Sequence, residues 1–522
     1  MSQTKVKTDE SEKKMSVEMN QIRRVGLVGA GTMGRGIAQV CAQAGFEVKL
    51  FDAVPQVAEQ SKASIDKALV KLIEKGKLAE EDRQGILGRI HPCEALNDLF
   101  NCDLVIEAAI ENLEIKRQLF KSLDEGCPEQ TILVSNTSAI PISSIAALTA
   151  HRKRIAGLHF MNPVPLMKLV EVIQTPVNSA SVVETLLGFS QAIGKTPILV
   201  KDGPGFLVGN CARAFYTEAL RLLKECIASP AVIDRIIREA GGYRMGPFEV
   251  IDLVGLDVNY PSSKALFEDS FFDPRYQLTS GYKLLVEAGF LGRKTGMGFY
   301  RYQDGQPLAE ATAAAEHSTP AGLPKSAWLW AEKSAGLEML TTLAKKAGVV
   351  VLKEPSPGAL CLVAPIGRDT VSVVKQLGID AGSTVAVDTV YGWASHRTYM
   401  ACPGVRPEPL AQASTLLSSD GVVASQIHDS PGFIMQRFQA VITNLACDLM
   451  QQGLASPEAL NQGMKLGFNF PQGPLEAGDA LGSETVLTIV QALYNFYEED
   501  RYRPSPWLKR RGRLGLSLST PD

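Results

Sequence analysis

Three glycines and an acidic residue have the spacing of a phosphate-binding turn. Gly29, Gly31 and Gly34 follow the apolar run 22–28 and open a segment with helical spacing, and Asp52 closes the next apolar run. Gly29 permits the tight turn, Gly31 lets a pyrophosphate approach the backbone, and Gly34 lets helix and strand pack closely. A carboxylate at Asp52 accepts hydrogen bonds from ribose hydroxyls and repels a 2′-phosphate, so NAD is favoured over NADP. A structural turn that binds nothing is the alternative.

A second group of residues could move a proton. His159 ends the apolar run 155–158, and Glu171 follows in the next apolar run. An imidazole there could take a hydroxyl proton while the carboxylate fixes its tautomer. Ser138 comes just after the run 131–135, where polar residues of a parallel sheet face the ligand crevice. The structural alternatives are a histidine without catalytic duty and a helix cap at Ser138 or Ser143.

The elements that must position these residues predict an α/β, Rossmann-like N-terminal domain over 22–200, preceded by a disordered tail at 1–21. Residues 201–302 have helical spacing, and the Ala-, Pro- and Gly-rich stretch 303–325 is interpreted as a linker. Strand-like runs return in 326–425, which predicts a small α/β-like segment, possibly a reduced relative of the first domain. Residues 426–522 are helical again.

One internal repeat supports this division. Asp-Gly-Pro-Gly-Phe at 202–206 recurs as Asp-Ser-Pro-Gly-Phe at 429–433, and Gly-Pro-Phe-Glu at 246–249 recurs as Gly-Pro-Leu-Glu at 473–476. Pro204 and Pro247 are 43 residues apart, as are Pro431 and Pro474. Equal spacing of two matched motifs indicates one helical module present twice.

Composition excludes several classes of function. The 522 residues contain 53 Lys and Arg against 56 Asp and Glu, so no broad basic field exists to hold nucleic acid or anionic lipid. The nine cysteines are scattered without a CxxC pair, which argues against a disulfide framework and a metal site. With no membrane-spanning run and no apolar signal segment, we expect a cytoplasmic protein.

Residues 22–302 resemble the L-3-hydroxyacyl-CoA dehydrogenases. The matching phrases are GLVGAGTMGRGIA, DLVIEAAIENLEIK, SNTSAIPIS, GLHFMNPVPLMKLVEVI, KDGPGF, GPFEVIDLVGLD and GRKTGMGFYRY. The second helical module resembles a further copy of the family's C-terminal domain. A long form of the family with two such copies is associated with phenylacetate breakdown, where the substrate is 3-hydroxyadipyl-CoA, while other members serve β-oxidation of fatty acids.

The resemblance implies a role for each matching residue. It makes His159 the catalytic base, Glu171 its partner and Ser138 a catalytic and substrate-binding residue. It places Glu111, Lys116 and Lys294 at the cofactor and Lys75 at CoA, although Ala68 stands where relatives have a CoA-contacting serine. The implied reaction is the NAD-dependent oxidation of a 3-hydroxyacyl-CoA, 3-hydroxyadipyl-CoA or 3-hydroxybutyryl-CoA, to the 3-ketoacyl-CoA.

One position departs from the family pattern. Relatives have a substrate-contacting asparagine where this chain has Gly209, and Asn210, the remaining candidate for substrate binding, comes one residue later. One residue is a rotation of about 100° on a helix, so Asn210 cannot simply replace it. Gln436 keeps an amide at the matching position of the second module. An impaired site, a backbone shift and a contribution from the second module all stay open.

Two other functions stay open beside this one. A related dehydrogenase could act on a hydroxy acid without CoA, although the Lys-rich stretch 62–77 suits CoA phosphates. A non-catalytic NAD-binding scaffold is the third possibility. We expect a homodimer formed through the helical modules, with a monomer as the alternative if the two modules satisfy each other.

Overall fold

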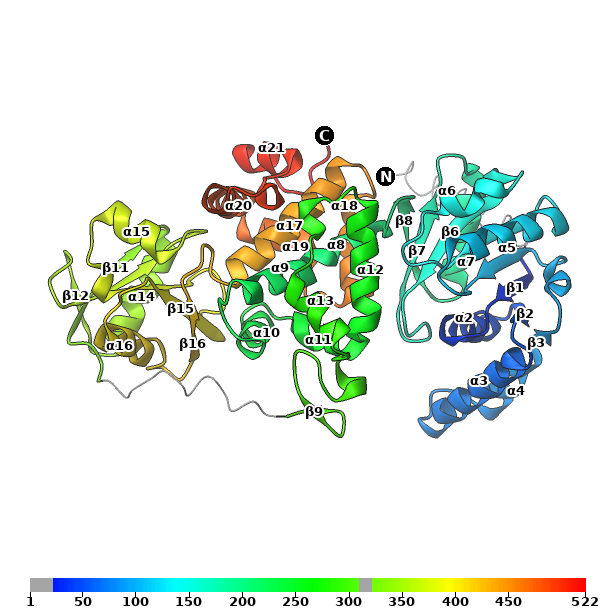
Figure 1. Cartoon of the computed structure of the whole chain (residues 1–522), viewed down its shortest axis with the longest axis horizontal. Helices are drawn as coiled ribbons and strands as arrows, with labels where there is room; N and C mark the ends of the chain where they lie inside the picture. Colours follow the sequence, from blue (N-terminus) through cyan, green and yellow to red (C-terminus); the bar gives the residue numbers. More distant parts are fainter. Residues whose placement is uncertain (1–21, 309–321) are drawn as a thin grey trace, which may run out of the picture. The chain divides into compact units, whose positions relative to one another are not determined.

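The computed structural model describes residues 22–308 and 322–522. The predicted tail and residues 309–321 of the predicted linker lie outside this range. The described chain forms two compact units, one of residues up to Asn210 with 453–468 added, the other of 211–452 and 469–522. The predicted fold class is confirmed: a parallel sheet with helices, then helical modules, with a second sheet between them (Figure 1).

The first unit is built on an eight-stranded sheet of order β3-β2-β1-β4-β5-β6-β7-β8. All neighbours are parallel except β6 and β7. The strand order changes direction between β1 and β4, which is where such sheets bind ligands. The strands are β1 (Arg24–Val28), β2 (Glu47–Phe51), β3 (Ile90–Cys93), β4 (Leu104–Glu107), β5 (Ile132–Ser135), β6 (Ile155–Phe160), β7 (Leu169–Gln174) and β8 (Thr196–Lys201).

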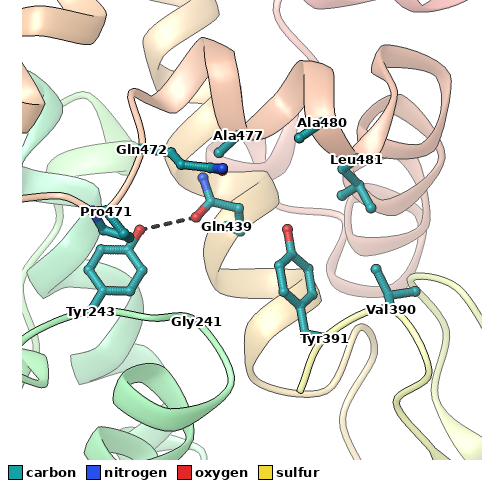
Figure 2. A pocket seen from close by; sticks show the side chains of 10 residues that line it. All are labelled: Gly241, Tyr243, Val390, Tyr391, Gln439, Pro471, Gln472, Ala477, Ala480 and Leu481. Atoms are coloured by element: carbon teal, nitrogen blue, oxygen red, sulfur yellow. Dashed lines mark hydrogen bonds between the residues drawn. The ribbon is translucent and has the colours of Figure 1, made fainter. Parts of the chain in front are cut away.

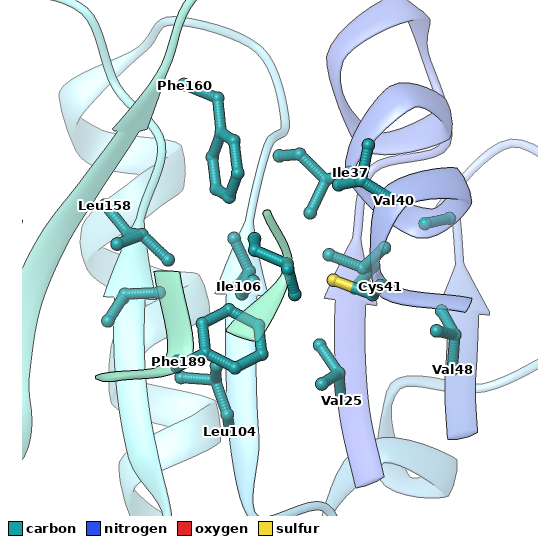
Figure 3. Packing of buried hydrophobic residues seen from close by; sticks show 14 of the residues in the cluster. Val25, Ile37, Val40, Cys41, Val48, Leu104, Ile106, Leu158, Phe160 and Phe189 are labelled. Carbon is teal, nitrogen blue, oxygen red and sulfur yellow. The ribbon is translucent and has the colours of Figure 1, made fainter. Parts of the chain in front are cut away.

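Helices cover both faces of this sheet. One face is closed by α2 (Thr32–Gln43), α3 (Val57–Glu74), α4 (Glu80–Gly88) and α7 (Ala180–Ala192). Apolar side chains from these helices and from the strands, such as Cys41, Ile106 and Phe189, form one buried core (Figure 3). The strands α5 (Leu113–Gly126) and α6 (Ile142–Ile145) follow, β4 and β5, carry the other layer. The unit ends in α8 (Phe206–Cys211) and includes α18 (Pro457–Phe468).

The second unit holds both helical copies and the second sheet. The first copy comprises α9 (Arg213–Lys224), α10 (Pro230–Glu239), α11 (Pro247–Val254), α12 (Leu256–Asp269) and α13 (Ser280–Glu287). The second comprises α17 (Met435–Gln451), α19 (Pro474–Leu481), α20 (Ser483–Tyr497) and α21 (Pro506–Leu514). The start of the predicted linker is ordered, because β9 (Tyr302–Gln303) and β10 (Gln306–Pro307) form a hairpin.

The second sheet is a shortened version of the first. Its order is β12-β11-β13-β14-β15-β16, and only β14 and β15 are antiparallel. The pattern across β13 to β16 therefore repeats that across β5 to β8. The elements are β11 (Ser326–Ala331), α14 (Ser334–Lys346), β12 (Val350–Leu352), β13 (Leu360–Ala364), α15 (Thr370–Leu377), β14 (Thr384–Val387), β15 (His396–Ala401), α16 (Pro407–Leu417) and β16 (Val423–His428).

The two repeats share an unusual turn. Gly205 and Phe206 have φ values of 68° and 49°, and their counterparts Gly432 and Phe433 have 75° and 52°. A phenylalanine in the left-handed region is strained, so its presence in both copies marks a conserved backbone geometry within this chain. The repeat seen in the sequence is thus a repeat of structure.

A buried ion network joins the two helical copies within the second unit. The Arg437 guanidinium donates to Glu218 Oε1 at 2.5 Å and to Glu225 Oε2 at 2.7 Å, and the side chains of Arg437 and Glu218 have no solvent exposure. Burial acts to raise the pKa of Glu225, but hydrogen bonds and charge from Arg437 lower it to about 2. Phe215 and Phe438 pack beside this network with ring centroids 5.5 Å apart. This helical face is therefore occupied within one chain.

A buried carboxyl of the second sheet yields a pH-dependent stability test. Burial raises the pKa of Asp388 to about 6. Between its unfolded value and about 6 the folded state holds a proton that the unfolded state lacks, so this group's contribution to stability falls as pH rises. In Asp388→Asn that loss is absent. We expect the thermal midpoint of the variant, relative to the original chain, to rise from about pH 4.5 to 7.5, equivalent to about 2–3 kcal/mol.

The control for this prediction has the opposite sign. A hydrogen bond from Arg397 lowers the pKa of Asp420, so its carboxylate adds stability that is lost on acidification. Asp420→Asn should therefore lose ground against the original chain as pH rises. A flat difference curve for Asp388→Asn would contradict the assignment.

Candidate active site

The glycine turn lies at the point where the strand order of the first sheet reverses. Gly29 has a φ of 98° and donates its N–H to Phe51 O at 2.8 Å, which ties the turn to the end of β2. A Cβ on Gly29 would lie 2.5 Å from Ala108 O, and a Cβ on Gly34 would lie 1.8 Å from Gly29 O. A Cβ on Gly31 would meet nothing within 4 Å. Two glycines are therefore required by the protein itself, whereas Gly31 borders open space.

The acidic residue after β2 is tied to the same turn. Asp52 Oδ2 accepts the Ala30 N–H at 2.8 Å, and Oδ1 accepts the Val54 N–H at 2.9 Å. The carboxylate is half-buried and belongs to the wall of the turn. These features fit a dinucleotide: a helix N-terminus, an open backbone at Gly31 and a carboxylate for ribose hydroxyls.

His159 and Glu171 meet across the antiparallel pair in the sheet. They are register partners on β6 and β7, and His159 Nδ1 lies 2.7 Å from Glu171 Oε2. The Glu171 side chain has no solvent exposure, while that of His159 is 14% exposed. Glu171 Oε1 accepts the N–H groups of Leu207 and Val208, each at 3.0 Å. The geometry expected for a base and the carboxylate that orients it is present.

Ser138 lies on the exposed loop after β5, beside a charged cluster. Its N–H donates to Glu111 Oε1 at 3.3 Å, and the Thr137 hydroxyl donates to the same oxygen. Helix α6 begins at Ile142 and is capped by Asp202, whose two oxygens accept the Ile142 and Ser143 N–H groups at 2.8 Å. Neither Ser138 nor Ser143 caps this helix, so that structural alternative does not apply.

The ENLEIK phrase contributes a buried ion cluster. Lys116 Nζ lies 2.6 Å from Glu107 Oε1 and 3.3 Å from Glu111 Oε2, and its side chain is 1% exposed. Glu107, fully buried at the end of β4, also accepts the Ser135 hydroxyl at 2.5 Å. The sequence analysis had noted Glu107 only as the end of a strand. Its position at the carboxyl end of a central strand was the signal that could have identified it.

Several predicted residues lie away from this cluster. Lys75 is exposed at the end of α3, and Lys294 lies in the second unit, where its ammonium pairs with Asp257. The Asn210 amide donates back to Pro204 O at 2.6 Å and to Phe206 O. The assignments of Lys75 to CoA, Lys294 to the cofactor and Asn210 to substrate stay predictions.

The departure at Gly209 is a loss of a side chain without a backbone change. Residue 209 lies inside the regular helix α8, and a Cβ there would have only Ser138 O near it, at 4.0 Å. Gln436, its counterpart, is buried in the second unit, where its amide bonds Gly367 N–H and Asp388. The amide missing at Gly209 is therefore not replaced by a local shift, and that of Gln436 is engaged elsewhere.

The second sheet does not repeat the site. Where the first sheet has its glycine turn, β11 is followed by Glu332 and Lys333, and Glu332 pairs with Arg368 at 2.6 Å. Asp388 donates its N–H to Thr398 O at 2.9 Å, so Asp388 holds the register position that His159 holds in the first sheet. A carboxylate at the turn would repel a pyrophosphate, so this copy lacks the dinucleotide site.

A small cavity lies beside this second sheet. It has a volume of about 180 Å³, and Tyr243 donates to Gln439 Oε1 across it at 3.0 Å (Figure 2). Its lining contains no charged side chain: Gly241, Tyr243, Val390, Tyr391, Gln439, Pro471, Gln472, Ala477, Ala480 and Leu481. It offers no counterpart of the His159–Glu171 pair.

Comparison with known proteins agrees with this geometry. Residues 24–203 match the NAD binding domain of 3-hydroxyacyl-CoA dehydrogenase, and residues 205–302 and 432–518 match its C-terminal domain. The chain belongs to the 3-hydroxyacyl-CoA dehydrogenase family and is an NAD-dependent oxidoreductase of that family. The repeated C-terminal domain makes it a two-copy member.

Relatives of both lengths are found. The 3-hydroxyadipyl-CoA dehydrogenase of Escherichia coli K12 is 35% identical over 498 residues, 95% of this chain and 98% of that protein. A crystal structure of a 3-hydroxybutyryl-CoA dehydrogenase from Escherichia coli K12 has a TM-score of 0.82 at 34% identity and covers 95% of this chain and 99% of that one. The human mitochondrial hydroxyacyl-coenzyme A dehydrogenase is 42% identical over 54% of this chain and 92% of its own length.

No helix among the described residues is long and apolar enough to cross a membrane.

The glycine turn makes a prediction about cofactor binding. Gly31→Ala should fold with an unchanged thermal midpoint, because the added Cβ meets no protein atom, yet should weaken NADH binding by roughly tenfold or more, about 1.4 kcal/mol. Gly34→Ala should lose both stability and binding, because its Cβ collides with a backbone oxygen. Thermal melting and NADH fluorescence titration check both variants. Unchanged NADH affinity in Gly31→Ala would show that the pyrophosphate does not approach this turn.

Proposed function

We propose that this chain oxidises an L-3-hydroxyacyl-CoA to the 3-ketoacyl-CoA with NAD⁺, and that His159 is the base. The observation that carries the proposal is the His159–Glu171 pair at 2.7 Å, at the carboxyl edge of the sheet that also holds the glycine turn. A structural histidine would not need a fully buried carboxylate held by two further backbone donors. Family membership supports the same reaction class.

The residues divide the chemistry between them. NAD⁺ held at the glycine turn would supply the acceptor for the hydride from C3. Because Nδ1 of His159 faces Glu171, Nε2 is the atom that takes the hydroxyl proton, and the carboxylate stabilises the imidazolium that forms. Ser138, on the neighbouring loop, is proposed to hydrogen-bond the substrate oxygen. Lys116 and Glu111 order that loop through the Thr137 and Ser138 contacts.

The proposed substrate is 3-hydroxyadipyl-CoA. The support is the 35% identity to the Escherichia coli enzyme of that name across both helical copies, whereas single-copy relatives match about half of this chain. The homodimer and the cytoplasmic location stay predictions; since α9 and α17 pack on each other, a dimer would use another surface. Light scattering measures the mass directly.

The function is tested by following NADH oxidation with acetoacetyl-CoA and with 3-ketoadipyl-CoA. Turnover of both with a higher kcat/KM for 3-ketoadipyl-CoA is expected. Activity with acetoacetyl-CoA alone would keep the reaction and remove the dicarboxylate assignment. Bound NADH with no turnover of either thioester would point to a hydroxy acid without CoA or to a scaffold.

The base is tested by Glu171→Gln. The glutamine oxygen still accepts from Leu207 and Val208, but its NH₂ group faces Nδ1 and forces the proton onto Nε2. We expect kcat to fall roughly 10²–10⁴-fold with NADH binding unchanged. His159→Ala should fall at least as far.

The matched control is Asp124→Asn. Asp124 is a buried carboxylate that pairs with Arg154 at 2.7 Å, just before β6 begins, away from the carboxyl edge. It should lose stability and keep kcat. An equal loss of kcat in both variants would mean that Glu171 acts through folding alone.

A further inference from the structure

The two halves of the chain exchange helices in a reciprocal way. Within the first unit, Lys201 N–H at the end of β8 donates to Leu454 O, just before α18, at 2.9 Å. Within the second unit, His428 N–H at the end of β16 donates to Ile227 O, just before α10, at 2.9 Å. The offset that relates Pro204 to Pro431 relates the members of these two bonds. Each sheet is thus completed by the helical copy that belongs to the other.

Helix α18 belongs to the first unit for this reason. It contacts β7 and β8, although α17 and α19 on either side of it belong to the second unit. Its sheet-facing side is formed by Leu460, Gly463, Met464 and Gly467, which recur at the spacing of one helix face. Leu460 and Met464 have no solvent exposure.

The glycines of that face are required by close packing. Glycine inside a helix costs about 1 kcal/mol relative to alanine. A Cβ on Gly467 would lie 2.6 Å from Leu169 Cδ2 and 3.5 Å from both methyls of Val208, and one on Gly463 would lie 3.0 Å from Ile198 Cδ1. The propensity cost is offset by the approach of α18 to β7, β8 and α8.

The surface covered by α18 is the surface that holds the catalytic carboxylate. Val208 lies under both glycines, and its N–H is one of the two backbone donors to Glu171 Oε1. Leu169, under Gly467, is on the same strand as Glu171, two residues before it. Contacts therefore run without a gap from the second helical copy to the carboxylate beside His159.

We infer that the second helical copy acts in cis as a positioning element for the active site, because α18 fixes the backbone that holds Glu171 against His159. This inference rests on the proposed catalytic role of that pair. It assigns a task to a module whose own sheet has neither the glycine turn nor the histidine. Gly463 and Gly467 are positioning residues and touch no reacting atom.

The experiment compares Gly467→Val with Ala240→Val in the full chain. Ala240 is the counterpart of Gly467 under the repeat and lies against Gly392 beside the second sheet, which lacks the catalytic pair. We expect Gly467→Val to lower kcat by roughly tenfold, with the KM for NADH and the NADH dissociation constant within about twofold of the original, since a small misplacement near reacting groups is costly. Ala240→Val should keep kcat.

A double variant separates positioning from general destabilisation. If α18 acts through Glu171, Gly467→Val adds no further loss of kcat in the Glu171→Gln background. Should Gly467→Val fail to fold, Gly463→Ala replaces it, because its added methyl meets only side-chain ends. That variant is expected to lower kcat in the same direction by a smaller factor, although a purely local effect would favour alanine in the helix.

Three results would overturn the inference. A folded Gly467→Val, or Gly463→Ala in its place, with the original kcat shows that α18 does not position the pair. The same fractional loss in the presence and absence of Glu171→Gln shows that α18 acts by another route. Unchanged kcat in Glu171→Gln itself removes the proposed role of the pair and the inference with it, and thereby distinguishes the two failures.

Discussion

The buried carboxylate of Glu171 is the constraint on which the arrangement of the active site depends. A carboxylate without solvent access is costly unless donors surround it. Its three donors come from His159 on β6 and from Leu207 and Val208 on α8. These can converge only if β6 runs antiparallel to β7 inside an otherwise parallel sheet, and if α8 begins directly after the strained turn at Phe206. Strand direction, turn geometry and helix start are therefore coupled at one side chain.

The second half of the chain keeps this scaffold and has lost its chemistry. The turn at Gly432 and Phe433 and the antiparallel pair β14–β15 are retained, but Asp388 holds the position of the histidine. Burial raises the pKa of Asp388 to about 6. What the half contributes is packing, both through the Arg437–Glu218 pair and through α18. Buried ion pairs of this kind are better at fixing which surfaces meet than at adding stability.

The charged cluster around Lys116 shows how the cofactor side of the site is ordered. One ammonium bridges Glu107 and Glu111, and Glu111 in turn holds the loop of Thr137 and Ser138. Such a pair is strongly destabilised if one partner is removed, because the other charge is left buried. The serine of the site therefore depends on residues from two different strand ends.

The sequence alone determined those features that depend on local order along the chain. Glycine spacing after an apolar run predicted the turn at Gly29 and the NAD-binding sheet, and equal motif spacing predicted the repeated helical module. His159 and Glu171 could be suspected as a pair, since they lie in successive strand-like runs. Glu107 was missed, because a carboxylate at a strand end gives no sign of its distant partners.

Tertiary structure decided what depends on contacts between distant segments. It showed that Gln436 is occupied in its own unit, that Asn210 bonds its own helix, and that α18 packs beside Glu171 across more than half the length of the chain. Periodicity identifies an apolar helix face but not the surface that covers it. That choice is made by shape, as in the glycine face of α18, and becomes visible only when the chain is folded.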